Sequence, residues 1–291
     1  MAAVGVDLAA AEQFVLREAR LLDRRRFAFL HRGGSADAVV AALVAHRNGD
    51  GGFGNALESD IRGNASQTVP VERAFELLDE VDRFDAELVA SACDWLSSVT
   101  TDAGGVPFVL PTVVDGPHAP WWEPANVEAN LNPTAGIAGV LHKRGIDHAW
   151  LDSATEFCWT DLEQGVDGLG PDDAISVLTF LEHVHDRERA AAVFDALGER
   201  ILGDLVALDP NAEGYVKTPL DFAPRPDSPA RGLFDDTTID THLDALATKQ
   251  QDDGGWPITW EPPGAAAVSE WRGVVTLKAL AVLDAYAAFT R

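Results

Sequence analysis

Residues Leu246-Ala-Thr-Lys-Gln-Gln-Asp-Asp-Gly-Gly-Trp256 align without gaps on Leu43-Val-Ala-His-Arg-Asn-Gly-Asp-Gly-Gly-Phe53. Helix-like segments with matching apolar residues follow both stretches, namely Ala279-Leu-Ala-Val-Leu-Asp284 and Ala74-Phe-Glu-Leu-Leu-Asp79. The Asp-Gly-Gly-aromatic element suits a turn at a helix end, because glycine adopts the left-handed conformation and aspartate accepts hydrogen bonds from the exposed amides. The aromatic residue then packs against a neighbouring helix. Two matched copies predict a fold of repeated helix pairs.

A third, degenerate copy lies between these two. Asp94-Trp-Leu96 is followed by Ala103-Gly-Gly-Val-Pro107 and then by the helix-like Thr134-Ala-Gly-Ile-Ala-Gly139. Asp167-Gly-Leu-Gly170 and Glu213-Gly-Tyr215 are candidates for still weaker copies. Because a single Asp-Gly-Gly sequence is a common turn, the prediction depends on its repetition together with the flanking helices.

Apolar residues recur at helical spacing through most of the chain, and no stretch alternates as a half-buried strand would. The pattern predicts about ten helices, near residues 14–22, 39–44, 74–78, 88–96, 134–144, 149–162, 172–184, 188–207, 236–250 and 271–289. Long loops rich in glycine, proline and aromatic residues separate some of them, at 101–131, 208–234 and 252–270. The sequence therefore predicts one all-α domain over residues 1–291.

Composition restricts the partners and the compartment. The formal net charge of −25 repels phosphate backbones and anionic lipids, so neither nucleic acid nor an anionic membrane is an expected partner. No apolar run approaches the roughly 18 residues of a spanning helix, and the first residues lack the basic region of a signal peptide. We expect a cytoplasmic protein with Cys93 and Cys158 as reduced core residues. The sequence does not indicate an oligomeric state.

The stretch Gln250-Gln-Asp-Asp-Gly-Gly-Trp256, echoed by Asp50-Gly-Gly-Phe53, resembles the Gln-Trp repeat of squalene-hopene cyclases, class II diterpene cyclases and protein prenyltransferase β subunits. The chain also looks like a group of short, uncharacterised prenyltransferase-like proteins. This resemblance implies an α/α toroid, in which inner and outer helices alternate around an apolar cavity. It also implies a small apolar or isoprenoid ligand in that cavity.

The resemblance suggests a proton donor. Class II cyclases protonate an alkene or epoxide with an acid of an Asp-x-Asp-Asp motif, and the nearest match here is Leu233-Phe-Asp-Asp-Thr-Thr238, where Leu233 replaces the first aspartate. Asp235 and Asp236 are the corresponding candidate catalytic acids. A second partial match, Gly170-Pro-Asp-Asp-Ala174, also lacks the first aspartate. Aspartates that precede a helix also act as N-caps, which is the structural alternative for both pairs.

Metal and cofactor chemistry is not predicted. Asp235, Asp236 and Asp240 fit a loose Asp-Asp-x-x-x-Asp spacing for magnesium, but the companion motif of class I synthases is incomplete. Neither cysteine has a further ligand at zinc spacing, and His183-Val-His185 is isolated. Nucleophile-elbow, dinucleotide-binding and P-loop motifs are absent from the sequence.

Acidic and aromatic residues after the two closest repeats complete the predicted site. Asp60 is the third candidate catalytic acid. If the toroid closes, Glu58, Asp60 and Arg62 meet Glu270, Trp271 and Arg272 at one mouth, each group entering a helix. These residues support general acid chemistry or form salt bridges that close the ring. The predicted ligand-contacting residues are Glu58, Trp121, Trp122, Trp256, Glu270 and Trp271.

Three functions follow as hypotheses. The leading one is a terpene cyclase-like protein that cyclises or isomerises an isoprenoid by acid catalysis. The second is a binding or scaffold protein that keeps the fold without the chemistry. The third is a glycan-processing α/α toroid, with Asp60 or Asp235 as carboxylates and sugar platforms formed by Trp121, Trp122, Trp256 and Trp260.

Overall fold

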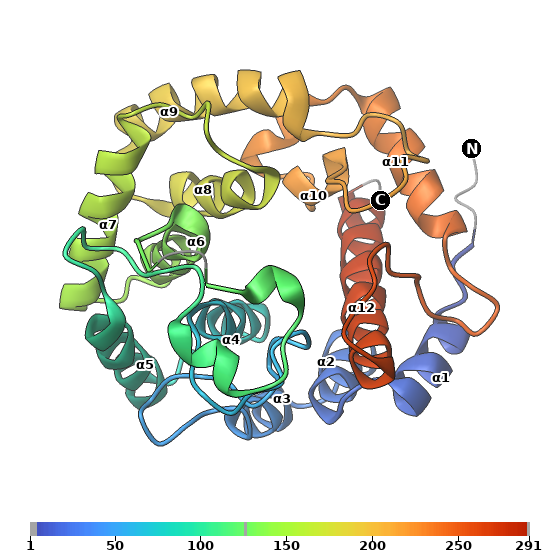
Figure 1. Ribbon diagram of the computed structural model, residues 1–291. Helices are drawn as coiled ribbons and strands as arrows, with labels where there is room; N and C mark the ends of the chain where they lie inside the picture. The colour runs from blue at the N-terminus through green and yellow to red at the C-terminus, as the bar shows by residue number, and fades with distance from the viewer. Residues whose placement is uncertain (1–4, 125–126, 290–291) are drawn as a thin grey trace. The chain divides into compact units, whose positions relative to one another are not determined.

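The computed structural model describes residues 5–124 and 127–289 (Figure 1). Twelve α-helices and no β-strand occur among these residues, and the few β-bridges are isolated. The predicted all-α class is therefore confirmed. The helices are α1 Leu8–Glu18, α2 Leu21–Arg32, α3 Ala36–Val44, α4 Thr68–Glu80, α5 Ala86–Val99, α6 Leu131–Lys143, α7 Ala149–Leu162, α8 Pro171–His183, α9 Arg187–Arg200, α10 Pro219–Phe222, α11 Asp236–Thr248 and α12 Ala265–Phe289.

The first predicted helix is in fact two helices, α1 and α2. The chain is extended at Ala19, where φ is −80° and ψ is 161°, and it remains extended at Arg20. The break lets Arg20 Nε reach the fully buried carboxylate of Asp23 at 2.9 Å, and Arg26 reaches the same carboxylate at 3.0 Å. Buried charges are tolerated when they are paired in this way. The interpretation of residues 14–22 as one helix was wrong. The buried residues on the two sides of the break keep the spacing of a single helix, so the apolar pattern does not show where the first helix ends.

Two other boundaries differ from the prediction. The helix α10 lies in the predicted loop 208–234, where the Asp221 carboxylate accepts a hydrogen bond from Thr218 N at 2.8 Å. Such a capping box supports even a short helix. The helix α12 begins at Ala265, directly after Gly264, so part of the predicted loop 252–270 is helical.

The chain divides into two compact units. Unit 1 contains Met1–Val39 and Ile201–Arg291, and unit 2 contains Val40–Arg200. Helices α1 and α2 therefore belong to the same unit as α10, α11 and α12, and the middle of the chain forms the other. The single domain over residues 1–291 stays a prediction.

Helix α6 is central to unit 2. It packs against α4, α7 and α8, and Figure 1 shows α4, α6 and α8 side by side. Every residue of α6 from Pro133 to Leu141 is buried. The approach to α8 is close because a Cβ at Gly139 would lie 2.4 Å from Thr179 O. A glycine is thus required at this helix contact.

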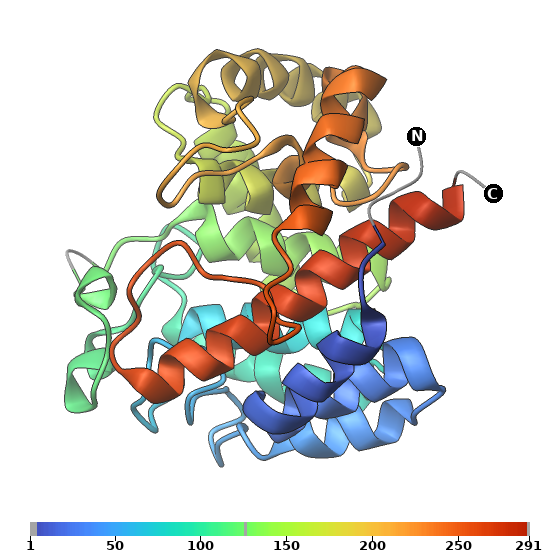
Figure 2. The same cartoon turned by 90° about the vertical axis from the view of Figure 1, so that its right-hand side faces the viewer.

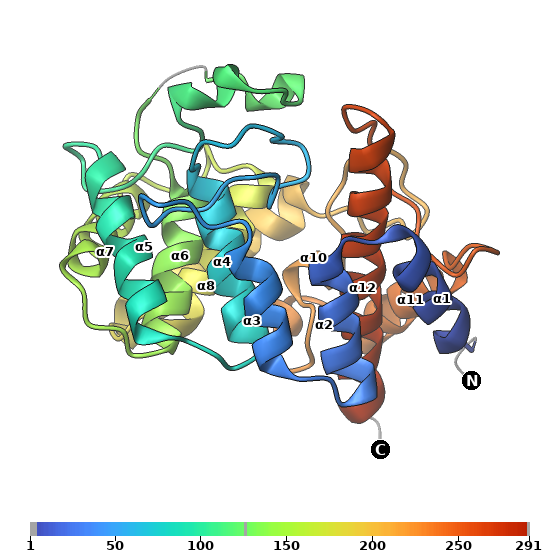
Figure 3. The same ribbon diagram turned by 90° about the horizontal axis from the view of Figure 1, so that it is seen from below.

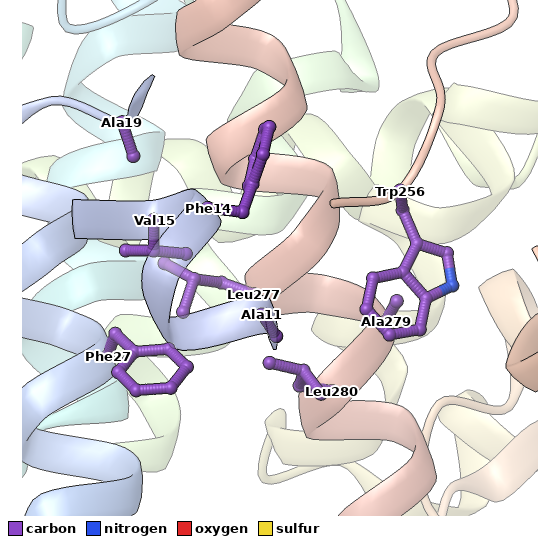
Figure 4. Close-up of a cluster of buried hydrophobic side chains, with 9 residues drawn as sticks. All are labelled: Ala11, Phe14, Val15, Ala19, Phe27, Trp256, Leu277, Ala279 and Leu280. Atoms are coloured by element: carbon purple, nitrogen blue, oxygen red, sulfur yellow. The ribbon is translucent and has the colours of Figure 1, made fainter. Parts of the chain in front are cut away.

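Helix α12 is central to unit 1. It packs against α1, α2 and α11, and Figures 2 and 3 show it running alongside α1 and α2. Trp256 is 1% exposed and lies in a buried cluster with α1 and α12 side chains, including Phe14 and Leu277 (Figure 4). The Trp256 indole donates to Leu246 O at 2.8 Å, so its one polar atom is also satisfied.

The repeated turn recurs three times with one geometry. The first glycines, Gly51, Gly104 and Gly254, have φ angles of +96°, +95° and +93°. A Cβ at each would lie 2.5 Å from Ser91 O, 2.9 Å from Ser153 O and 2.1 Å from Ala10 O, respectively. Each turn therefore fits against the backbone of α5, α7 or α1, and only glycine allows this approach.

The second glycine of each turn faces an aromatic ring. Ring carbons of Trp95, Phe157 and Phe14 lie 2.6, 2.5 and 2.7 Å from the Cβ positions of Gly52, Gly105 and Gly255, respectively. Each aromatic residue stands four positions after the carbonyl that the first glycine approaches, so both contacts come from one helix face. The degenerate copy at 103–107 is thus a true repeat of the turn.

The other two candidate copies lack this helix contact. A Cβ at Gly168 or Gly214 would meet nothing within 4 Å, and one at Gly170 would meet only Asp173 Oδ2, at 3.3 Å. The turns at these positions therefore do not fasten a helix in the way that the three repeats do.

We expect Gly254→Ala to destabilise the protein more than Gly264→Ala. Both glycines have positive φ, so each substitution introduces backbone strain of about 1–3 kcal/mol. A Cβ at Gly264 meets open space, whereas one at Gly254 overlaps Ala10 O, which adds about 1–3 kcal/mol. Urea unfolding measures both free energies. Equal losses would contradict the importance of the close approach.

Candidate functional site

Glu72 of α4 lies between α6 and α8 in unit 2. Ser176 Oγ of α8 donates to Glu72 Oε1 at 3.5 Å. On the α6 side, a Cβ at Gly136 would lie 1.9 Å from the same oxygen. The carboxyl group therefore occupies the space left by the missing side chain at position 136. Three helices together enclose one carboxyl group.

This environment favours the neutral acid. Burial raises the pKa of Glu72 well above its usual range, and the negative charges of Glu76 and Asp172 raise it further. The Ser176 hydrogen bond and the Arg73 charge lower the pKa by less than this. Glu72 is half-buried as a residue, and its carboxyl group is the part that lies against Gly136 and Ser176. A protonated carboxyl group of this kind can act as a general acid.

Further acids lie at the start of α8. The Asp173 carboxylate accepts a hydrogen bond from Gly170 N at 2.9 Å, so it caps the helix as the structural alternative predicts. Burial raises the pKa of Asp173, and the charges of Asp172 and Asp161 add to the shift. Within residues 5–124 and 127–289, no three His, Cys, Asp or Glu side chains gather closely enough to hold a metal ion.

Asp235 and Asp236 are placed as helix-start residues in unit 1. The Asp235 carboxylate accepts a hydrogen bond from Thr238 N at 2.7 Å, and this bond lowers the pKa of Asp235. Asp236 is exposed and pairs with Arg231, and Asp240 is exposed as well. A proton donor needs a raised pKa, so the geometry of Asp235 supports capping rather than acid catalysis.

Glu58 and Asp60 lie in the loop before α4, not at a helix start as expected. The helix begins only at Thr68, whose hydroxyl donates to Pro107 O at 2.8 Å. Glu58 is 7% exposed and Asp60 is 2% exposed. Their loop packs against residues 106–123, and Ala119 N donates to Asp60 O at 2.9 Å. The long loops of unit 2 thus form a packed layer of their own.

The predicted aromatic contacts differ in exposure. Trp121 is 49% exposed, whereas Trp122 is buried and stacks on Phe108 with ring centroids 4.9 Å apart. Trp256 is fully buried in the core, so it offers no face to a sugar or an isoprenoid. The turn that carries Trp256 requires this placement, because its aromatic residue packs under the neighbouring helix.

Glu270 and Trp271 lie on α12 in unit 1 and are half-buried. Glu58 and Asp60 belong to unit 2, so the meeting of the two groups at one mouth stays a prediction. The structure brings together, within one unit, Glu72 with the acids of α8.

Sequence reasoning missed Glu72. The residue stands four positions after Thr68 and three before Phe75, both fully buried, so it shares their helix face. The position of Glu72 on a buried helix face, together with the glycines at 136 and 139 of an apolar helix, is the sequence signal that indicates a buried acid.

A scan of known protein families found no match to this chain, and a search of curated proteins found no relative. No helix among the described residues is both long and apolar enough to cross a bilayer.

We expect Glu72→Gln to stabilise the protein above neutral pH and to change little at low pH. A raised folded-state pKa gives stability that is present below the unfolded pKa and is lost as pH rises through the folded pKa. Glutamine cannot ionise, so the gain at high pH is about 1–3 kcal/mol. Urea unfolding across pH measures it. The exposed Glu87→Gln is the control, and an equal pH-dependent gain there would contradict the assignment.

We expect Asp235→Ala to lower the thermal midpoint and Asp235→Asn to leave it nearly unchanged. Asparagine keeps the oxygen that accepts from Thr238 N, whereas alanine does not. Because the folded-state pKa of Asp235 is lowered, the wild-type advantage over alanine should shrink as pH falls through that pKa. Thermal unfolding followed by circular dichroism tests this, and equal midpoints for the two variants would exclude capping.

Proposed function

We propose that the chain forms an α/α toroid of the terpene cyclase type, binds an isoprenoid-like apolar molecule and transfers a proton to it from Glu72. The recurrence of the Asp-Gly-Gly-aromatic turn in an all-α chain supports the toroid. The single observation that carries the chemistry is the enclosed carboxyl group of Glu72, whose pKa is raised well above its usual range. Acid-catalysed cyclisation or isomerisation needs such a protonated acid near an apolar substrate.

The proposed step balances without a cofactor. The Glu72 proton bonds to one alkene carbon, the π bond breaks, and the neighbouring carbon becomes cationic. Water then takes a proton from an adjacent carbon, or a second double bond first attacks the cation and closes a ring before water takes the proton. Water returns a proton to Glu72. The negative charges of Glu76 and Asp172 near Glu72 stabilise the positive intermediate.

The proposal departs from the resemblance in the position of the acid. Class II cyclases use an aspartate of the Asp-x-Asp-Asp motif, and here Leu233 occupies the first position of the nearest match. The pKa of Asp235 is lowered by the capping hydrogen bond, which favours the ionised form at neutral pH. Glu72 has the opposite shift, so we assign the proton to Glu72.

Solvent deuterium tests the proposal. The protein is incubated in D2O with squalene or geranylgeranyl diphosphate, and extracts are analysed by gas chromatography and mass spectrometry. Proton-initiated chemistry should add one solvent deuteron to each product molecule. Glu72→Gln should abolish the product, because glutamine has the size of glutamate but donates no acidic proton.

The control variants identify the acid. Asp235→Asn should retain product formation, and its loss there but not in Glu72→Gln would return the role to Asp235. Native mass spectrometry of the purified protein detects a bound isoprenoid independently of turnover. A bound isoprenoid that is never converted would favour the non-catalytic binding hypothesis. The absence of both ligand and product would contradict the proposed function.

A further inference from the structure

The last turn of α6 carries a histidine that faces two neighbouring helices. His142 Nε2 and Thr155 Oγ1 of α7 lie 2.9 Å apart, within hydrogen-bond distance. The His142 ring also lies 6.0 Å from the Phe180 ring of α8 and meets the His185 ring edge-on, with centroids 5.4 Å apart and planes at 82°. His142 is half-buried, whereas His185 is exposed just after α8. One imidazole thus contacts side chains from α7, from α8 and from the segment that follows α8.

Most of the groups that influence His142 oppose its protonation. Burial is the main cause that lowers the pKa of His142, and positive charge on His185 and His183 lowers it further. Asp152 of α7 raises this pKa, but by less than His185 lowers it. Histidine commonly gains a proton between about pH 5 and pH 8. The His142 side chain therefore stays neutral to a lower pH than an ordinary histidine does.

On α4, the third helix packed against α6, the acid near this end of α6 is already paired with cations. The Asp79 carboxylate lies 2.7 Å from Lys143 Nζ and 2.6 Å from Arg144 Nε, on the two residues that follow the histidine. On the α8 side, Glu182 Oε1 lies 3.9 Å from His183 Nε2. These acids thus have basic neighbours of their own, and the surroundings favour a neutral imidazole at the end of α6.

We propose that His142 is an acid-sensitive contact, which holds α6 against α7 and α8 while it is neutral and loosens this packing when it gains a proton. The half-buried cation is poorly hydrated and is repelled by a charged His185, so the unit opens locally to expose it. The same two helices, α6 and α8, enclose the Glu72 carboxyl group between Gly136 and Ser176. The contact therefore sets the lowest pH at which this enclosure persists, whether or not Glu72 transfers a proton.

Three acids of the same unit predict the opposite pH dependence. Because the folded-state pKa of His142 is lowered, its contribution to stability is complete above the unfolded pKa and is lost as pH falls towards the folded pKa. The pKa values of Glu72, Asp161 and Asp173 are raised, so protonation of these acids favours the folded state. A loosening of unit 2 on acidification therefore cannot come from these three acids.

Hydrogen exchange of the backbone amides tests the proposal between about pH 7.5 and pH 5. Measured rates are divided by the intrinsic rates of the unstructured chain at each pH, so that only protection is compared. Protection in α6 and at the end of α8 should fall about tenfold over this range, because the open state takes up a proton that the packed state excludes. His142→Gln keeps a hydrogen-bonding group near Thr155 but cannot ionise, so this loss should disappear.

A second variant serves if His142→Gln does not fold. His185→Gln, at an exposed position, removes one positive charge and should raise the pH at which the His142 ring titrates in imidazole-selective NMR spectra. The matched control is His148→Asn in the same unit, where the histidine Nε2 lies 3.3 Å from Asp94 Oδ1 and asparagine can still cap α7. This variant should leave the loss of protection unchanged.

Four results would overturn the proposal. They are unchanged protection of α6 and α8 at low pH, a loss that persists in His142→Gln, a loss that His148→Asn also removes, and a His142 titration that His185→Gln does not move.

Discussion

The close approach of a glycine turn to the backbone of another helix is the constraint on which the fold depends. In each of three places, a Cβ on the first glycine would overlap a helix carbonyl, most severely at Gly254. The second glycine lies against an aromatic ring one helical turn further along. The spacing between helices is therefore fixed by the absence of side chains, and the aromatic ring fills the remaining space.

The third turn has an additional consequence, because it connects segments near the two ends of the chain. The Gln250 side chain accepts from Asp7 N and donates to Asp7 O, both at 2.9 Å. Gly254 fits against Ala10 in the following helix, and Trp256 packs in the same cluster as Phe14. These contacts explain why α1 belongs to the same compact unit as α11 and α12, despite its distance in sequence.

Sequence patterns predicted this architecture better than they predicted the site. The Asp-Gly-Gly-aromatic repeat and the helical periodicity identified the turns and most helices, because both depend on local geometry and burial. Periodicity could not reveal the break at Ala19, since the residues on both sides of it, such as Val15 and Leu22, are equally buried. Motif comparison indicated Asp235, but a motif does not specify whether a carboxylate caps a helix or donates a proton. Glu72 belongs to no sequence motif. Only its contacts with Gly136 of α6 and Ser176 of α8, which the structure shows, identify it as a candidate acid.

Glu72 shows how the same constraint can create chemistry. Glycine inside a helix costs about 0.5–1 kcal/mol relative to alanine, yet α6 has Gly136 opposite the carboxyl group. A side chain there would displace the carboxyl group from Ser176 and from the enclosed space that raises its pKa. Glu72 lies little more than one turn into α4, where the helix dipole favours a negative charge, but burial and the neighbouring acids outweigh this effect. Gly136 thus makes room for an acid, as Gly51 makes room for a carbonyl. The acidity of the site follows from how closely the helices pack.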